Sequence, residues 1–414
     1  MGKKVLVIGG GGRCHAIVDA LSRSPQVEKV YAAPGNAGIA RQAECVPISV
    51  SDIEALLAFA RENGIDLTVV GPEGPLAAGI VDRFRAEGLR IFGPTQSATR
   101  IESSKEFAKD LMSRHGVPTA SYRTFSDFGE ALGYVKAGPV PVVIKYDGLA
   151  AGKGVVVALT YAEAEDALRD MLLDECFGQG RVVIEEFLDG PEFSFMCLVN
   201  GRKLYPLAIA RDHKRAFDND RGPNTGGMGA YSPVPFVTEE IRETALRTIL
   251  QPVADAMVDE GVPFTGVLYG GLILHNGTPK VIEFNARFGD PETEVVLPRL
   301  ESDFYALLDA AVDGRDFETE WSELTTLGIV MAAKGYPGKY DKGYVVRGLE
   351  NAGKVYHMGT VEKEGKILTA GGRVLMPVAA APTLAEARAE AMKAVNAVDC
   401  SGLFFRNDIG AREA

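Results

Sequence analysis

The sequence has few cysteines and no long apolar run. Its five cysteines, among 414 residues, stand far apart and form no C-x-x-C pair, a pattern typical of free thiols in a reducing compartment. No apolar stretch approaches the roughly 20 residues that a membrane-spanning helix needs. The opening segment, Met1–Gly10, has only a short apolar run before its glycines, so it predicts a β-strand rather than a signal peptide. We therefore expect a cytoplasmic protein that does not contact membranes.

Positive charge is also in the minority. There are 44 Lys and Arg against 56 Asp and Glu, a net charge of −12, which argues against nucleic-acid binding because that function usually needs a basic face. The hydrophobic (46%) and charged (24%) fractions are ordinary and exclude a disordered or fibrous chain. Glycine, by contrast, is abundant: 47 residues, about 11% against a usual share of about 7%. The composition therefore predicts a globular protein in which the backbone must approach something closely.

Short apolar runs alternate with helical patterns over the first hundred residues. Strands are predicted at 4–9, 27–33, 67–71 and 90–92. Helices are predicted at 13–22, from the cap at Ser51 to about Asn63, and at 76–87. Capping boxes at Ser51-x-x-Glu54 and Ser103-x-x-Glu106 open helices. The alternation predicts a parallel sheet, whose ligands bind at the carboxyl ends of the strands.

The remainder of the chain changes character twice. A β-rich segment around a glycine loop predicts a small inserted domain at 121–190, followed by a long polar loop at 211–232 and a helix near 238–260. A hairpin with strands at 266–274 and 279–285 turns on Asn276-Gly277, and the chain is strand-rich beyond 327. We expect an α/β protein divided into 1–103, then 104–120 with 191–326, then the inserted 121–190, and finally 327–414.

The first glycine loop, Gly9–Gly12, lies between a predicted strand and a predicted helix. It is a poor dinucleotide fingerprint because Cys14 stands at the third glycine position and no acidic residue follows the second strand. Such a loop can present backbone amides to a phosphate, helped by Arg13. The alternative is a tight strand–helix turn with an exposed arginine, and this loop alone does not decide between them.

The second glycine loop runs from strand to strand between Lys145 and Val155. It lacks the hydroxyl that binds magnesium in a P-loop, since Gly154 stands there. A lysine on the preceding strand and Lys153 within the loop suit a flap over a triphosphate, against the alternative of a mobile hairpin with solvated lysines. The apolar residues before Lys145 predict that it is partly buried, and a buried lysine needs an anion.

Two further segments carry polar side chains in patterns that suit a site. Glu283, Asn285 and Arg287 share one face of a predicted strand. A carboxylate with a carboxamide suits Mg²⁺, which takes few protein ligands beside nucleotide phosphates, and Arg287 can bind a carboxylate or phosphate. Aromatic flanks make the alternative, a solvated ion pair, improbable. The loop at 211–232 is rich in basic and turn-forming residues, and its length favours a small-molecule cradle.

At these residues the chain resembles the ATP-grasp ligases and, more narrowly, the phosphoribosylamine–glycine ligase (glycinamide ribonucleotide synthetase) family. The resemblance covers essentially the whole chain. The motifs that carry it are Asp147–Gly154 (DGLAAGKG), Glu185–Gly190 (EEFLDG), Asp212–Arg215 (DHKR), Gly222–Pro233 (GPNTGGMGAYSP) and Glu283–Thr293 (EFNARFGDPET), with Ala33–Gly38 (APGNAG) and Gly71–Glu73 near the start.

The resemblance implies an ATP-grasp fold with an N-terminal Rossmann-like domain, a flap domain and a C-terminal β-rich domain. It implies ligation of glycine to 5-phosphoribosylamine through glycyl phosphate, with ATP cleaved to ADP and phosphate, the second step of de novo purine synthesis. The cofactors would be ATP with Mg²⁺ or Mn²⁺. The enzyme would be a monomer, with a dimer as the alternative.

The resemblance also assigns residues to sites. Phosphates of ATP would be held by Lys105, Lys145, Gly152, Lys153 and Gly154, adenine by Glu185, Glu186, Phe187 and Leu188, and the ribose by Glu192. Glu283 and Asn285 would bind the metal. Arg287, Asp212 and Lys145 would be catalytic, and the substrates would contact Gly11, Gly12, Arg13, Asn36, Asp212, Asn224, Thr225, Arg287, Gly289, Asp290 and Pro291.

Three residues depart from the family pattern. Cys14 replaces a usual Glu, Tyr146 a small residue, and Glu294 a frequent Gln. Two other functions compete with the ligase: an ATP-grasp enzyme that uses another acid, such as formate or bicarbonate, and a nucleotide-binding module without catalysis. The 211–233 segment argues against the first, and the intact lysines and metal ligands argue against the second.

Overall fold

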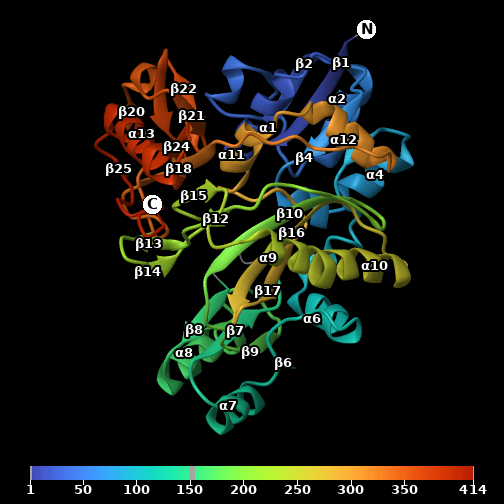
Figure 1. The fold of residues 1–414 in the computed structure, drawn as a ribbon, viewed down its shortest axis with the longest axis vertical. Helices are drawn as coiled ribbons and strands as arrows, with labels where there is room; N and C mark the ends of the chain where they lie inside the picture. Colours follow the sequence, from blue (N-terminus) through green and yellow to red (C-terminus); the bar gives the residue numbers. More distant parts are fainter. Residues whose placement is uncertain (1, 149–153, 414) are drawn as a thin grey trace.

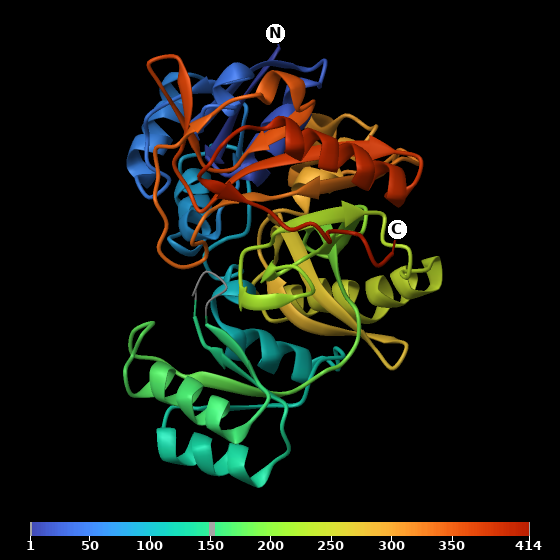
Figure 2. The same cartoon turned by 90° about the vertical axis from the view of Figure 1, so that its left-hand side faces the viewer.

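The computed structural model describes residues 2–148 and 154–413. Figure 1 shows the N-terminal part (blue) beside the C-terminal part (orange to red), with the central sheets below them. A group of helices and strands between residues 121 and 190 projects from the far end of the molecule in Figure 1, and the side view in Figure 2 shows the same projection. Within the described residues, no helix combines the length and the apolar character needed to cross a membrane.

The N-terminal sheet is parallel, with strand order β3-β2-β1-β4-β5, as predicted. Its elements are β1 (Lys3–Gly9), α1 (Gly12–Ser22), β2 (Val27–Pro34), η1 (Ile39–Arg41), β3 (Glu44–Cys45), α2 (Ile53–Glu62), β4 (Leu67–Val70), α3 (Glu73–Ala77), α4 (Ile80–Ala86) and β5 (Ile91–Phe92). Both faces are buried, since Val5 and Val7 belong to one core cluster and Leu6 and Ile8 to another.

Local details of this sheet differ from the predictions. The single helix predicted at 76–87 is two helices, because Gly79 between them adopts a left-handed conformation with φ of +85°. The predicted capping box at Ser51 is wrong: Asp52 caps α2 and accepts a hydrogen bond from the amide of Ala55 at 3.1 Å.

The projecting part is an antiparallel sheet of order β6-β9-β7-β8 with a core of its own. Its elements are β6 (Tyr122–Phe125), α7 (Phe128–Ala137), β7 (Val142–Tyr146), β8 (Val155–Ala158), α8 (Tyr161–Leu172) and β9 (Val182–Glu186). We call this part, residues 121–190, the flap. Helix α7 was not predicted from the sequence.

The central sheet has the antiparallel order β11-β10-β16-β17, and the predicted hairpin forms its β16–β17 pair. The elements of this region are α5 (Arg100–Ser103), α6 (Lys105–Arg114), β10 (Glu192–Asn200), β11 (Lys203–Pro206), α9 (Glu239–Ala245), the π-helix η2 (Leu246–Leu250), α10 (Gln251–Asp259), β16 (Thr265–His275), β17 (Thr278–Asn285), α11 (Thr293–Val296), η3 (Leu297–Arg299) and α12 (Phe304–Asp313). The predicted cap at Ser103 is wrong by one residue, since Ser104 caps α6 by accepting from the amide of Phe107.

The C-terminal sheet has the order β12-β15-β18-β24-β19-β25, with β21 also paired to β24, and β20-β23-β22 form a separate small sheet. The strands and helices are β12 (Arg211–Asp212), β13 (Arg215–Phe217), β14 (Arg221–Asn224), β15 (Gly229–Ser232), β18 (Thr325–Ile329), β19 (Met331–Ala333), β20 (Val345–Val346), η4 (Leu349–Asn351), β21 (Lys354–His357), β22 (Thr360–Lys363), β23 (Lys366–Thr369), β24 (Arg373–Ala381), α13 (Leu384–Ala397) and β25 (Leu403–Phe404). The prediction of an unstructured loop at 211–232 is therefore wrong, because four of these strands lie within it.

Candidate active site

Lys145 lies in a buried triad at the base of the flap. It is only 3% exposed, as its apolar neighbours predict, and its Nζ lies 2.9 Å from Glu185 Oε1 and donates to the carbonyl of Ile282 at 2.8 Å. Lys109 on α6 pairs with the other oxygen, Glu185 Oε2, also at 2.9 Å. Burial lowers the pKa of Lys109 to about 8 despite this partner. Because Glu185 is on β9 and Ile282 on β17, the triad connects the flap to the central sheet.

The other residues predicted to hold the nucleotide surround this triad. Lys105, at the start of α6, donates to the carbonyl of Gly148 at 3.0 Å. The backbone carbonyl of Gly154 accepts from the amide of Tyr146. Gly152 and Lys153 lie outside the described residues. Glu186, the last residue of β9, and Phe187 after it are exposed, whereas Leu188 is buried.

Glu283 on β17 lies among cations from separate parts of the chain. Burial acts to raise the pKa of its carboxyl, but Lys214, Lys145, Lys105 and Arg287 together outweigh it and lower that pKa. Among the described residues, neither a hydrogen bond nor an ion pair joins the Glu283 carboxylate to another side chain. It is thus an ionised acceptor available to a ligand.

The Glu283 and Asn285 side chains fit a divalent cation that keeps other ligands. The described residues contain no cluster of three or more His, Cys, Asp or Glu suited to hold a metal alone. Glu283 has free acceptor oxygens, and Asn285 Oδ1 accepts only from Arg287 Nη2, at 2.9 Å. Two hard oxygen donors with open positions suit Mg²⁺, which commonly completes its shell with phosphate and water.

Arg287 is clamped between two acidic side chains, of which the sequence analysis gave Glu73 only as part of a motif and did not single out Glu102. Its Nη2 lies 3.2 Å from Glu102 Oε1, and its Nε lies 3.4 Å from Glu73 Oε2. Glu102 also accepts from the amide of Ala286 at 2.8 Å. Burial acts to lower the pKa of the Arg287 guanidinium, but the nearby acidic side chains, Glu102 and Glu73 above all, outweigh it and raise that pKa, so Arg287 remains a cation.

Asp212 lies beside Lys214 and two other carboxylates. Burial raises the pKa of Asp212 to about 7; Lys214 opposes that rise, and Glu292 and Glu192 add to it. Lys214 itself pairs with Glu192 at 3.0 Å, and Glu292 accepts from the hydroxyls of Ser194 and Tyr269. An aspartate that titrates near neutrality can exchange a proton during a reaction.

A turn from the 211–232 segment meets the loop after β17 through Arg373 of the C-terminal sheet. Arg373 Nη1 donates to the carbonyls of Gly226 (2.6 Å) and Asp290 (2.9 Å), and its Nη2 pairs with Asp290 Oδ1 at 2.9 Å. Thr225 Oγ1 holds the turn by donating to the carbonyl of Lys214 and accepting from the amide of Gly227. Asn224 ends β14. Arg373, absent from the predicted set, thus joins two predicted substrate segments.

The first glycine loop meets the same loop from the other side. Asp290 Oδ2 accepts from the backbone amide and from the Nε of Arg13, both at 3.4 Å, and Arg13 Nη1 donates to the carbonyl of Phe288 at 2.9 Å. Gly289 and Pro291 are buried in this contact, while Gly11 is partly open. The predicted substrate residues of the loop are therefore brought together at the N-terminus of α1.

The Asn36 side chain holds the first glycine loop in place through hydrogen bonds. Its Nδ2 donates to the carbonyls of Gly10 (2.9 Å) and His357 (2.7 Å), and its Oδ1 accepts from the amides of Gly38 and Ile39. These contacts use its hydrogen-bonding capacity, so its effect on a substrate would come through the position of the glycine loop.

Two of the residues that depart from the family pattern, Cys14 and Glu294, lie against this loop. Cys14 is buried, and burial raises the pKa of its thiol to about 12; it fills space against the loop, and all five cysteines are free. Glu294 is fully buried, and neither of its carboxyl oxygens has a hydrogen-bond partner in the described residues. A Cβ on Gly12 would lie 2.2 Å from Glu294 Oε1, which explains why glycine stands there.

Glu294→Gln is expected to stabilise the protein increasingly as pH rises. Burial and the neighbouring Asp290 raise the pKa of Glu294 well above its usual value, so the native carboxyl keeps a proton that the unfolded chain releases. The stability this gives is complete below the unfolded pKa and is lost as pH rises towards the native one. The amide has no such dependence, and we expect a gain on the order of 1 kcal/mol at about pH 8 that shrinks towards about pH 5. Urea unfolding at both pH values measures it.

The exposed Glu318→Gln variant is the matched control for this substitution and should follow the wild type at both pH values. A gain for Glu294→Gln that is the same at both would contradict a protonated Glu294.

The comparisons with known proteins cover the whole chain. Residues 3–102, 103–293 and 326–412 match models described as the N domain, the ATP-grasp (A) domain and the C domain of phosphoribosylglycinamide synthetase. The chain is 54% identical to a phosphoribosylamine–glycine ligase of Halalkalibacterium halodurans, over 99% of this chain and 96% of that protein. It is 49% identical to one of Vibrio cholerae, over 99% and 98%.

Solved structures agree with these matches. The crystal structure of a phosphoribosylamine–glycine ligase from Thermotoga maritima, 35% identical, superimposes with a TM-score of 0.88 over 98% of this chain and 100% of that one. The biotin carboxylase domain of the Hydrogenobacter thermophilus 2-oxoglutarate carboxylase, solved with MgADP and bicarbonate, is 19% identical and has a TM-score of 0.72, over 98% and 92% of the two chains. The second likeness extends to the fold alone.

Proposed function

The chain belongs to the phosphoribosylglycinamide synthetase family, and from that premise we propose how its residues carry out the reaction. It is an ATP-dependent ligase that joins glycine to 5-phosphoribosylamine, the second step of purine biosynthesis. ATP-grasp enzymes use ATP with divalent metal ions.

The nucleotide binds between the flap and the central sheet. Lys105 and Lys145, with Gly152, Lys153 and Gly154 of the flap loop, hold its phosphates, and the segment from Glu185 to Leu188 binds adenine, with Glu192 at the ribose. The burial of Lys145 against Glu185 supports this, because the ammonium is held in one place before ATP arrives. Phosphoryl transfer depends mainly on such positioning and on charge neutralisation.

Glu283 and Asn285 would hold Mg²⁺, or Mn²⁺ in its place. When bound there, the ion supplies charge neutralisation at the phosphate oxygens. The ionised Glu283 carboxylate and the amide oxygen of Asn285 support this assignment.

Arg287 binds the carboxylate of glycine and directs one oxygen at the γ-phosphorus of ATP. A bond forms between them and the bond from that phosphorus to the β–γ bridging oxygen breaks, which gives glycyl phosphate and ADP. The amine of phosphoribosylamine then attacks the acyl carbon and phosphate leaves. The amine loses a proton in this step, and Asp212 accepts it, since its raised pKa suits that role.

The phosphoribosyl group binds where three segments meet at the N-terminus of α1. Gly11, Gly12 and Arg13 come from the first loop, Gly289, Asp290 and Pro291 from the loop after β17, and Asn224 and Thr225 from the turn before β15. The direct contacts of Asp290 with Arg13 and Arg373 support one continuous site.

The observation that carries this proposal is the convergence of Lys105, Lys145, Lys214 and Arg287 on Glu283. Four cations around one ionised carboxylate suit a metal–triphosphate complex beside a carboxylate substrate. The test is ADP release by the purified chain with phosphoribosylamine generated in situ. Continued ADP release over many turnovers should require both glycine and phosphoribosylamine, and release that does not need glycine would overturn the proposal.

We propose a monomer in the cytoplasm, with a dimer as the alternative oligomeric state and with small-molecule partners rather than nucleic acid or membrane. We also propose the domain boundaries at 103/104, 120/121, 190/191 and 326/327, which the family matches at 102/103 and 326 support.

A further inference from the structure

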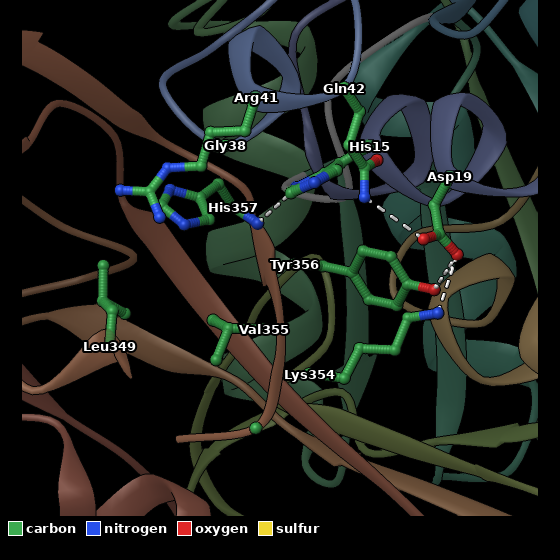
Figure 3. A pocket seen from close by; sticks show the side chains of 11 residues that line it. His15, Asp19, Gly38, Arg41, Gln42, Leu349, Lys354, Val355, Tyr356 and His357 are labelled. Atoms are coloured by element: carbon green, nitrogen blue, oxygen red, sulfur yellow. Dashed lines mark hydrogen bonds and ion pairs between the residues drawn. The ribbon is translucent and has the colours of Figure 1, made fainter. Parts of the chain in front are cut away.

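A cavity of about 220 Å³ lies at the seam between the N-terminal and C-terminal parts of the molecule. Figure 3 shows its walls, which come from α1, from the turn at η1 and from β21. The polar residues that line it are His15, Asp19, Arg41, Gln42, Lys354, Tyr356 and His357. The volume equals several water molecules at about 30 Å³ each, so it has room for a small ligand.

His15 contributes a hydrogen-bond donor that the protein does not use. It is 5% exposed, and its Nδ1 accepts the backbone N–H of His357 at 2.8 Å. Burial, and after it the neighbouring His357, lowers the pKa of His15 to about 3, so the ring is neutral. A neutral ring whose Nδ1 is an acceptor carries its proton on Nε2, and within the described residues no acceptor is paired with that N–H.

Arg41 contributes a charge that is likewise not paired. Its guanidinium lies beside the His357 ring (Figure 3), and it lowers the pKa of His357, after burial, to about 4. No hydrogen bond or ion pair joins Arg41 to another side chain in the described part of the protein. The one carboxylate of the cavity, Asp19, is already neutralised by Lys354 at 2.7 Å.

The cavity is connected to the glycine loop by two hydrogen bonds. The backbone carbonyl of His357 accepts from Asn36 Nδ2, and the same Nδ2 donates to the carbonyl of Gly10. Gly38 lets this turn approach β21, since a Cβ there would lie 2.4 Å from the His357 ring. A ligand that moves His357 would therefore also move the loop.

We propose that this cavity binds a phosphate-class anion, inorganic phosphate or a small phosphate monoester, between Arg41 and the Nε2–H of His15. An exposed arginine that has no ion-pair partner among the described residues, and a buried imidazole whose Nε2–H has no acceptor there, face a space larger than a water molecule and suit such an anion. The binding itself does not depend on the proposed function. Its consequence does: through His357 and Asn36, an occupied cavity alters the affinity for phosphoribosylamine.

The chain has five histidines, so their imidazole signals report binding directly. Two-bond ¹H–¹⁵N spectra would be recorded on ¹⁵N-histidine-labelled full-length protein during titration with inorganic phosphate or ribose 5-phosphate, against chloride at equal ionic strength. We expect saturable shifts of His15 and His357, with a Kd on the order of 1 mM or lower, and no shift of His115 or His275. Arg41→Ala should abolish the shifts, whereas Arg61→Ala, which removes an exposed arginine on α2 outside the cavity, should preserve them.

The site would be overturned if His15 and His357 showed no shift, or if their shifts persisted in Arg41→Ala. A shift confined to His213 would also overturn it. Inorganic phosphate and ribose 5-phosphate used separately distinguish the free ion from the ester. In kinetics, added phosphate should change the KM for phosphoribosylamine in wild type more than in Arg41→Ala, with the same kcat in both. Because the spectra need no turnover, they test the site even if the proposed function fails.

Discussion

Arg287→Met is expected to destabilise the protein by about 3–5 kcal/mol, the usual cost of removing one partner from a buried ion pair. The methionine would leave Glu102, which is 9% exposed, and Glu73 without the cation that lies 3.2 and 3.4 Å from them. Burial disfavours the ionised form of Glu102 and raises the pKa of its carboxyl. The charge of Arg287 is the largest effect that opposes this rise. The free energy of unfolding from urea denaturation measures the loss.

Two variants separate charge from geometry at this position. Arg287→Lys keeps the cation but not the planar guanidinium that binds a carboxylate through two hydrogen bonds. It should therefore be more stable than Arg287→Met, but its KM for glycine should be higher than that of the wild type. Arg114→Met breaks an exposed pair with Glu260, 2.8 Å apart, and should cost no more than about 1 kcal/mol. If Arg287→Met unfolds at the same urea concentration as Arg114→Met, the clamp is not a structural element.

Glu283→Gln is expected to lower kcat by at least about 10², the scale of losing one preorganised electrostatic contact at a reacting centre. The amide is nearly isosteric but carries no charge to balance Lys214, Lys145 and Lys105 or to bind a divalent ion. The Mg²⁺ concentration needed for half-maximal rate should rise as well. Steady-state kinetics across a Mg²⁺ series measures both quantities.

The fold of this variant should survive, because the Glu283 carboxylate has no hydrogen-bond partner among the described side chains. Unfolding by urea and the Glu318→Gln variant serve as controls for general effects of the substitution. A kcat within about threefold of wild type would remove Glu283 from the metal site.

The features that local sequence patterns predicted are those built from nearby residues. The parallel N-terminal sheet follows from alternating strand and helix patterns, and the hairpin from its Asn276-Gly277 turn. The burial of Lys145 follows from the apolar residues beside it. The turn and the burial of Lys145 depend on neighbouring residues. The sheet pairs residues far apart in the chain, such as Val5 with Leu67, but each of its strands and helices has a pattern of its own.

The features that the sequence did not reveal depend on distant partners. Arg13 and Asp290 are 277 residues apart, and Arg373 and Asp290 are 83 apart, so no spacing rule connects them. Lys109 lies on α6, whose sequence pattern predicts that one face of the helix is buried but does not predict the ion pair of Lys109 with Glu185. Strands β12 and β15, two and four residues long, are too short for a period and form by pairing with each other and, in the case of β15, with β18.

Transfer of oxygen from glycine to phosphate tests the central claim most directly. With glycine labelled with ¹⁸O in its carboxylate, the proposed route places one labelled oxygen in the bond to phosphorus, and that oxygen leaves with the phosphate. The predicted result is inorganic phosphate that carries one ¹⁸O atom per glycinamide ribonucleotide formed, measured by the isotope shift in ³¹P spectra. Unlabelled phosphate formed together with glycinamide ribonucleotide would contradict the account.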